Sequence, residues 1–139
     1  MSSDGTALVG RLREAVDAHD LDRLVACFAA DYRNETPAHP ARGFDGRDQV
    51  RTNWERLFTG IPDLSADVLR VASDGGTTWS EWEMRGTLPD GRRHLMRGVV
   101  IFGVADQQAS WARFYLEPVD QGDAGIDAAI ETIVGIDAP

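Results

Sequence analysis

Residues 78–87 read Thr-Trp-Ser-Glu-Trp-Glu-Met-Arg-Gly-Thr, and this stretch decides the fold. Its β-branched and aromatic residues alternate strictly in the pattern that is typical of a β-strand. Residues two apart share one face of a strand, so two acids lie between an aromatic and a basic residue: Trp79, Glu81, Glu83 and Arg85. Two carboxylates are costly to bury and ordinary on a wet surface. The function of the chain therefore depends on which way this face points.

Composition predicts one globular domain. The 139 residues are 42% hydrophobic and 27% charged, which are ordinary proportions for a single domain with one core. The net charge of −9 opposes binding to nucleic acid, whose phosphates would repel the chain. No apolar run approaches the ~20 residues of a membrane-spanning helix, and no signal peptide pattern is expected at the N-terminus. The lone Cys27 cannot form an internal disulfide, which favours a cytoplasmic protein.

Three helices and then four strands are expected along the chain. Apolar residues recur at helical spacing in segments 6–18, 21–29 and 47–58. Strand-like segments follow at 65–73, 77–88, 93–104 and 110–119. Segment 32–46 is irregular, and Pro89-Asp90-Gly91 forms a tight turn. We predict a single α+β domain over residues 1–139, with a core over 6–119 and an acidic, solvated C-terminal segment over 120–139.

Four short motifs have the order and spacing of a known fold. They are Asp20-Leu21-Asp22 between two helices, Phe28-Ala29-Ala30-Asp31-Tyr32, Gly46-Arg47-Asp48 at the third helix, and Arg113-Phe114-Tyr115-Leu116-Glu117 on the last strand. Over residues 8–119 the chain resembles the nuclear-transport-factor-2-like fold. This resemblance implies a cone in which three N-terminal helices pack on a curved, mainly antiparallel sheet. The fold hosts several kinds of enzyme as well as pure binding proteins.

Within this fold the chain is similar to SnoaL-type polyketide cyclases and limonene-epoxide-hydrolase-like enzymes. Tyr32-Arg33-Asn34 matches a Tyr-x-Asn element with which the epoxide hydrolases help hold the attacking water. Those enzymes also carry an Arg-x-Asp pair and a second aspartate on the last strand. A hand alignment puts Glu81 at the arginine, Glu83 at the first aspartate and Arg113 at the second. The resemblance therefore implies an acid–arginine–acid cluster in rearranged form.

Ketosteroid isomerases of the same fold use a tyrosine, an aspartate base and a protonated aspartic acid. The matching positions here are Leu12, Thr36 and Val100. None of these side chains can do the work of the residue it replaces, so ketosteroid isomerase chemistry is not expected.

The resemblance implies that the odd-numbered face of residues 77–87 looks into the cone. The lining is then apolar and aromatic with a few polar groups, which is usual for a small-molecule site. A flat, hydrophobic, partly oxygenated ligand would suit it. The candidate substrate-binding residues are Trp54, Phe58, Trp79, Met96, Val100, Phe102, Trp111, Tyr115 and, in a loop at the mouth, His39.

Glu81 and Glu83 are the candidate acid and base. Carboxylates about 7 Å apart on one strand face of a dry cavity do not both ionise easily, so one would have a raised pKa. Arg113 could set their charge state, and Tyr32 with Asn34 could bind water or a substrate oxygen. The alternative for the glutamates is structural, namely an ion pair with a neighbouring arginine, Arg85 or Arg97, at the rim.

Two functions remain open. One is a cofactor-free general acid–base enzyme that cyclises, isomerises or opens the epoxide of a hydrophobic small molecule. The other is a non-catalytic small-molecule-binding or dimeric scaffold protein. No metal-ligand spacing, phosphate loop or nucleophile elbow is present in the sequence, so neither a metal nor a cofactor is expected.

A homodimer is also expected. The face of the sheet away from the helices is predicted to leave apolar surface uncovered, which indicates a partner, and sheet-to-sheet homodimers are common where this fold is found. The residues assigned to that outer face are Ser80, Trp82, Met84, Leu95, Val99, Ile101, Phe114 and Leu116.

Overall fold

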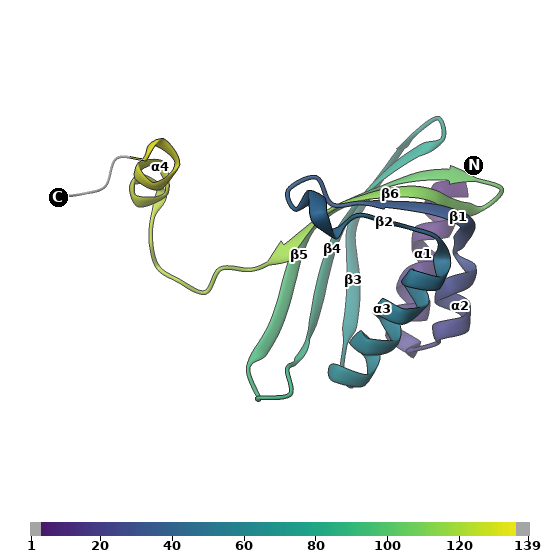
Figure 1. The fold of residues 1–139 in the computed structure, drawn as a ribbon, viewed down its shortest axis with the longest axis horizontal. Helices are drawn as coiled ribbons and strands as arrows, with labels where there is room; N and C mark the ends of the chain where they lie inside the picture. The colour runs from purple at the N-terminus through teal and green to yellow at the C-terminus, as the bar shows by residue number, and fades with distance from the viewer. Residues whose placement is uncertain (1–3, 136–139) are drawn as a thin grey trace.

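The structure is a computed structural model that describes residues 4–135. One curved six-stranded sheet wraps partly around three helices, and a fourth helix stands apart (Figure 1). The helices are α1 (Asp4–Ala18), α2 (Leu21–Ala26), α3 (Arg47–Gly60) and α4 (Ile126–Val134), with a short 3-10 turn η1 (Pro40–Arg42). The strands are β1 (Phe28–Glu35), β2 (Phe44–Asp45), β3 (Ser65–Asp74), β4 (Thr77–Thr87), β5 (Arg93–Ala105) and β6 (Gln108–Pro118). No helix in the described range is long and apolar enough to cross a membrane.

The strand order is β2-β1-β6-β5-β4-β3. Only the β1–β6 pair is parallel, and the other neighbours are antiparallel. The predicted α+β class and the helices packed on a curved, mainly antiparallel sheet are confirmed. The last four residues of the predicted acidic C-terminal segment lie outside the described residues.

Two strands were not expected, β1 and the short β2, which lies in the segment predicted to be irregular. The sequence favours a helix over residues 21–29, but α2 ends at Ala26 and β1 begins at Phe28. The Cys27 carbonyl accepts a hydrogen bond from Ala109 N–H at 2.8 Å, and Arg33 then lies opposite Trp111. The partner strand is about 80 residues away in the chain, so local patterning gives no sign of this pairing.

The sheet buries the even-numbered face of β4. Thr78, Ser80 and Trp82 are each 1% exposed, whereas Trp79 is 42% exposed. The prediction that the odd-numbered face looks into the cone is therefore wrong. The reason is register: Met84 lies opposite Met96, and residues that face each other across two strands point to the same side of the sheet.

The same register corrects the last strand. Phe114 lies opposite Val100 and Leu116 opposite Gly98, on the inner face. Five residues assigned above to the outer face are thus on the inner one: Ser80, Trp82, Met84, Phe114 and Leu116. Leu95, Val99 and Ile101 do lie on the outer face, with Trp79, Glu81, Glu83, Arg85, Trp111, Arg113 and Tyr115. The homodimer through this face stays a prediction, and most of the residues it would use are different.

Trp82 is the largest fully buried side chain of the described core. Its indole Nε1–H donates to Ser80 Oγ at 2.8 Å, and that hydroxyl donates to the Val100 carbonyl at 2.7 Å. The two bonds satisfy the polar atoms that burial takes from water. A tryptophan and a serine can therefore occupy the inner face without an unpaired donor.

The two tryptophans of β4 test this assignment of faces. Trp82→Ala should lower the free energy of unfolding by about 3–5 kcal/mol, because it removes a large buried side chain and leaves a cavity. Trp79→Ala, three residues earlier on the opposite face, should change it by about 0.5 kcal/mol or less. Urea unfolding followed by circular dichroism measures both. A larger loss for Trp79→Ala than for Trp82→Ala would contradict the observed register.

Candidate functional site

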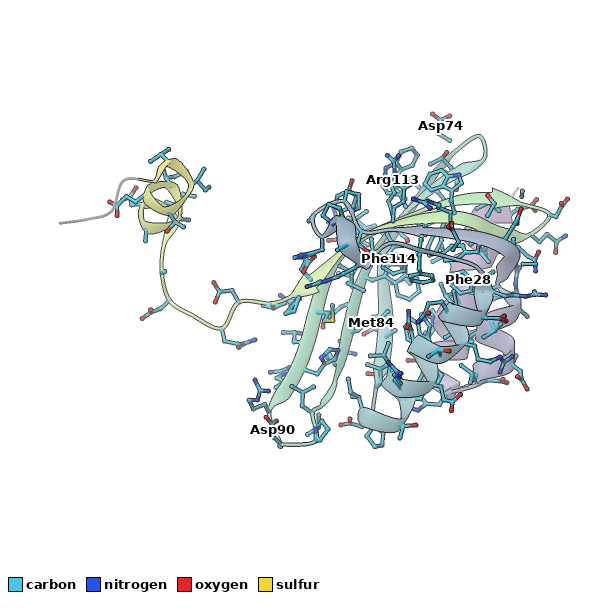
Figure 2. All side chains as sticks on the ribbon, in the orientation of Figure 1. Phe28, Asp74, Met84, Asp90, Arg113 and Phe114 are labelled. Atoms are coloured by element: carbon cyan, nitrogen blue, oxygen red, sulfur yellow. The ribbon has the colours of Figure 1, made fainter. Side chains whose placement is uncertain are left out.

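A cavity of about 300 Å³ opens to solvent between α3, residues 36–44 and the inner face of the sheet. Phe28, Met84 and Phe114 lie between the sheet and α3 (Figure 2), and each comes from a different strand. The main apolar and aromatic side chains around the cavity are Phe28, Phe44, Trp54, Met84, Met96 and Phe114. The polar side chains on its wall are Tyr32, Asn34, Thr36, Arg42, Asn53 and His94. The composition is that of a small-molecule site.

Tyr32 and Asn34 form the polar centre of the cavity. They are two apart on β1, so both point inward, and Tyr32 is fully buried while Asn34 is 7% exposed. The Tyr32 hydroxyl donates to Asn34 Oδ1 at 2.7 Å. Burial raises the pKa of Tyr32 far above its ordinary value of 10, so the phenol stays neutral. No described residue accepts a hydrogen bond from Asn34 Nδ2, which leaves this amide as the donor for a ligand.

Four predicted site residues line this cavity: Tyr32, Asn34, Trp54 and Met96. Val100 and Phe102 are on the inner face but are buried in the core, 2% and 0% exposed. Phe58 packs against the core and stacks on His19, with ring centroids 4.5 Å apart. His39 lies off the cavity wall, where its Nε2 is 2.9 Å from Glu117 Oε1.

The remaining predicted residues lie outside the cone. Trp79 and Tyr115 are each 42% exposed, and Trp111 lies opposite Gly103 on the outer face. Glu81 and Glu83 share that face with Arg113 because they follow the odd-numbered register of the β4–β5 and β5–β6 pairs. The alternation correctly predicted that the odd-numbered residues of β4 share one face, but this face is the outer side of the sheet and not the inner one.

Glu83 belongs to a network of surface ion pairs. Its Oε1 accepts a hydrogen bond from Arg85 Nη1 at 2.6 Å and its Oε2 one from Arg97 Nε at 2.8 Å. Arg85 also bonds Asp67 Oδ2 at 2.6 Å. The hydrogen bonds from Arg85 and then Arg97 hold the pKa of Glu83 below its ordinary value of 4.5. Glu83 therefore forms the ion pairs with Arg85 and Arg97 that the sequence analysis gave as the alternative to an acid–base role. The expected rise in pKa is wrong for this residue.

Arg113 and Glu81 have separate partners. Arg113 Nε is 3.4 Å from Glu35 Oε2, and its guanidinium lies over the Trp111 ring at 5.9 Å from the centroid. Glu81 Oε1 is 3.8 Å from Arg70 Nε. The acid–arginine–acid cluster that the hand alignment implied is therefore absent from the described residues.

His94 is the main residue that the sequence reasoning missed. It lies on the cavity wall, and burial lowers its pKa from 6.5, so the imidazole is neutral near pH 7. A signal was available, because His94 precedes Met96 by two residues on a strand and Met96 was already expected to face inward. Arg42 and Asn53 were missed because they come from the 3-10 turn and from α3, where no two-residue period applies, whereas Thr36 continues the spacing of Tyr32 and Asn34.

The cavity differs from other sites of this fold in its charges. Among the described residues, none that lines the cavity is an aspartate or glutamate. Of the ketosteroid isomerase positions, Thr36 lines the cavity, while Leu12 and Val100 are in the core. Within residues 4–135 no group of three or more His, Cys, Asp or Glu side chains is placed to hold a metal.

Solved structures share this architecture. An epoxide hydrolase of the limonene-epoxide-hydrolase type from Mycobacterium tuberculosis is 18% identical, covers 82% of this chain and 83% of its own, and has a TM-score of 0.71. Rv0760c of the same organism, in complex with estradiol-17β-hemisuccinate, is 18% identical over 82% of this chain and 94% of its own, with a TM-score of 0.71. IdmH from Streptomyces antibioticus, a candidate polyketide cyclase, is 21% identical. The match covers 84% of this chain and 92% of IdmH, with a TM-score of 0.70.

These likenesses confirm a nuclear-transport-factor-2-like fold. The family model of the SnoaL-like domain matches residues 9–113, and the chain belongs to this family. No curated protein matches the chain. The match ends within β6, so the segment that carries α4 lies beyond the part the family shares.

The surface role of Glu83 predicts a pH dependence of stability. A carboxyl whose pKa is lowered by folding stabilises the protein above its unfolded pKa, near 4.5, and this contribution is lost as the pH falls through the folded pKa. Glu83→Gln should therefore be less stable than the wild type at pH 7, and the difference should shrink as the pH falls below the unfolded pKa and through the lower folded pKa. Urea unfolding between about pH 3 and pH 7 measures it.

Glu81→Gln is the matched control on the same strand face, since its arginine is 3.8 Å away and no hydrogen bond joins them. Its effect at pH 7 should be smaller than that of Glu83→Gln. Equal stability of the wild type and Glu83→Gln at every pH would show that the network does not hold this carboxylate.

Proposed function

We propose that the protein binds a hydrophobic small molecule that carries an oxygen acceptor, and that the ligand occupies the cone cavity. The hydrogen-bonded pair of Tyr32 and Asn34 in an otherwise mainly apolar cavity carries this proposal. With Oδ1 engaged by the phenol, the Asn34 amide N–H groups are the donors that can meet a carbonyl, epoxide or hydroxyl oxygen. Aromatic and thioether side chains around them suit a flat ring system.

The charge distribution supports a neutral ligand or a weakly polar one. Within residues 4–135, no carboxylate lies on the cavity wall. Tyr32 stays protonated, and burial disfavours the charged form of His94. Arg42 is the one cationic side chain on the wall, and it is exposed, so its charge lies at the mouth. The steroid ring system of the ligand in Rv0760c is a hydrophobic skeleton of the kind proposed here, and its hemisuccinate arm adds a carboxyl group.

A pair of probes that differ by one oxygen tests the proposal. 2-Tetralone and tetralin have the same ring skeleton, and only 2-tetralone has a carbonyl. Asn34→Leu should weaken 2-tetralone binding by about tenfold, because it removes one hydrogen bond and a tenfold change in Kd corresponds to about 1.4 kcal/mol. It should leave tetralin binding unchanged, because the variant keeps the apolar lining. Isothermal titration calorimetry measures both affinities, and circular dichroism checks that the variant is folded.

Glu81→Gln is the control, since Glu81 lies on the outer face, and it should change neither affinity. If Asn34→Leu weakened both probes equally, the amide would act only through packing, and the proposed contact with the ligand oxygen would be refuted.

Acid–base catalysis is a second candidate function, and His94 favours it. A neutral imidazole on the wall of the same cavity can accept a proton from a ligand whose oxygen is held at Asn34. Loss of an α-proton from a ketone would place negative charge on that oxygen, where the amide N–H groups stabilise it. This scheme keeps the general acid–base class that the sequence suggested and moves the base from Glu81 or Glu83 to His94.

Deuterium exchange into 2-tetralone tests this candidate. The protein should accelerate exchange of the α-protons in D2O, with a rate that rises with pH and levels off once His94 is neutral. Because burial lowers the pKa of His94 from 6.5, the plateau should be reached by about pH 7. Proton NMR follows the exchange. His94→Asn should abolish the acceleration while 2-tetralone still binds, and exchange no faster than in buffer with the wild type would rule this candidate out.

A further inference from the structure

α4 is an amphipathic helix whose apolar side lacks a partner in the described structure. Ile126, Ile130, Ile133 and Val134 recur at helical spacing and are 73%, 48%, 77% and 57% exposed. None of the residues of α4 is buried. Figure 1 shows the helix away from the sheet, at the end of an extended segment that leaves β6. Apolar side chains gathered on one side of a helix indicate a surface that the helix is built to cover.

The length of α4 adds a second reason for a partner. The helix has 9 residues, and its N-cap residue, Gly125, has no side chain to cap it. Isolated helices shorter than about 12–15 residues are marginal in water, and most helical stability in proteins comes from packing of the apolar side. α4 therefore needs an apolar surface within its reach.

The mouth of the cone is within reach. Leu116 lines the cavity, β6 ends at Pro118, and Val119 N–H still bonds the Leu95 carbonyl at 2.9 Å. Residues 119–125 then link this rim to α4. Seven extended residues span at most about 25 Å. The helix can thus reach the cavity of its own chain without any strand moving.

Charge selects the mouth over the outer sheet face. The segment after Arg113 has no basic residue, and its described part carries Glu117, Asp120, Asp123, Asp127 and Glu131. Among the described residues that line the cavity, Arg42 is the one cation, and none is a carboxylate. On the outer face, in contrast, four arginines each have a carboxylate within 4 Å, namely Arg70, Arg85, Arg97 and Arg113, and Arg93 near the hairpin is the described exception. An acidic helix therefore gains more at the mouth.

Size determines how the helix would lie. A helix of 9 residues is about 13 Å long and 10–12 Å wide with its side chains. This volume exceeds a cavity of about 300 Å³, so only the isoleucine side chains can point into it. We propose that α4 closes over the mouth of its own chain's cone as a lid, with Ile126, Ile130 and Ile133 directed toward the cavity. The proposal concerns the unliganded chain and holds whether or not the cavity binds the ligand proposed above.

Hydrogen–deuterium exchange of the full chain tests the lid. The amides of residues 129–135 should exchange at least about tenfold more slowly in the wild type than in a synthetic peptide of residues 120–139, because docking stabilises the helix. Ile130→Gln should remove this protection, although glutamine is a good helix former. Ala128→Gln introduces the same side chain on the opposite side of α4 and should keep it. Arg42→Glu should speed the exchange of the same amides by removing an attractive charge at the mouth.

Several results would overturn the proposal. Exchange in the wild type as fast as in the peptide would show that α4 is undocked. Protection that survives Ile130→Gln would show that the apolar side is not used. Protection that resists Arg42→Glu would place the helix on another surface, such as the outer sheet face. Protection that is lost on dilution from about 50 μM to about 0.5 μM would show that α4 docks on a second copy instead of its own chain.

Discussion

The pairing of β4 with β5 determines which side chains the cone contains. Met84 lies opposite Met96 and Ser80 opposite Val100, so the even-numbered residues of both strands share one side of the sheet. A shift of one residue would exchange the two faces completely. It would place Glu81 and Glu83 in the cavity and expose Trp82. The observed register avoids the burial of these carboxylates and lets Ser80 satisfy the indole N–H of Trp82. The cavity and the ion pairs of the outer face both depend on this choice.

Periodicity predicts where most of the helices and strands lie in the sequence, but it does not predict how the strands pair. The helices α1 and α3 and the strands β3 to β6 follow from spacing and turn residues alone, and no end differs from the expected bound by more than two residues. β1 could not be found in this way because its parallel partner β6 is remote in sequence. The face of β4 was ambiguous because each side carries a tryptophan. The short hairpin from Leu88 to Arg92 held the missing information, since it fixes the opposition of Gly86 to His94 and so the faces of both strands.

The polar centre of the site could be predicted from a motif, and Trp54 and Met96 could be predicted from the helical and strand spacing. Tyr32 and Asn34 could be identified because their two-residue spacing puts both on one side of a strand, and their hydrogen bond joins them as a unit. The acidic residues could not, because the same alternation suits an active site and a wet surface equally. Electrostatics separates the two cases in the structure. Glu83 keeps its charge beside Arg85 and Arg97 with a lowered pKa. In the cavity, burial keeps two side chains neutral, Tyr32 by a raised pKa and His94 by a lowered one.

The access of water to the cavity affects the strength of the hydrogen bond that Asn34 could make to a ligand. A hydrogen bond from Asn34 to a ligand competes with hydrogen bonds that both groups make to water, so its net value is small while the mouth is open. Covering the mouth lowers the local dielectric, which strengthens that bond and further disfavours the protonated form of His94. The acidic charges of α4 would act in the opposite sense on His94, since Asp127 and Glu131 favour a cation near them. The position of these two carboxylates relative to the imidazole thus decides whether a closed cone holds a base or only a ligand.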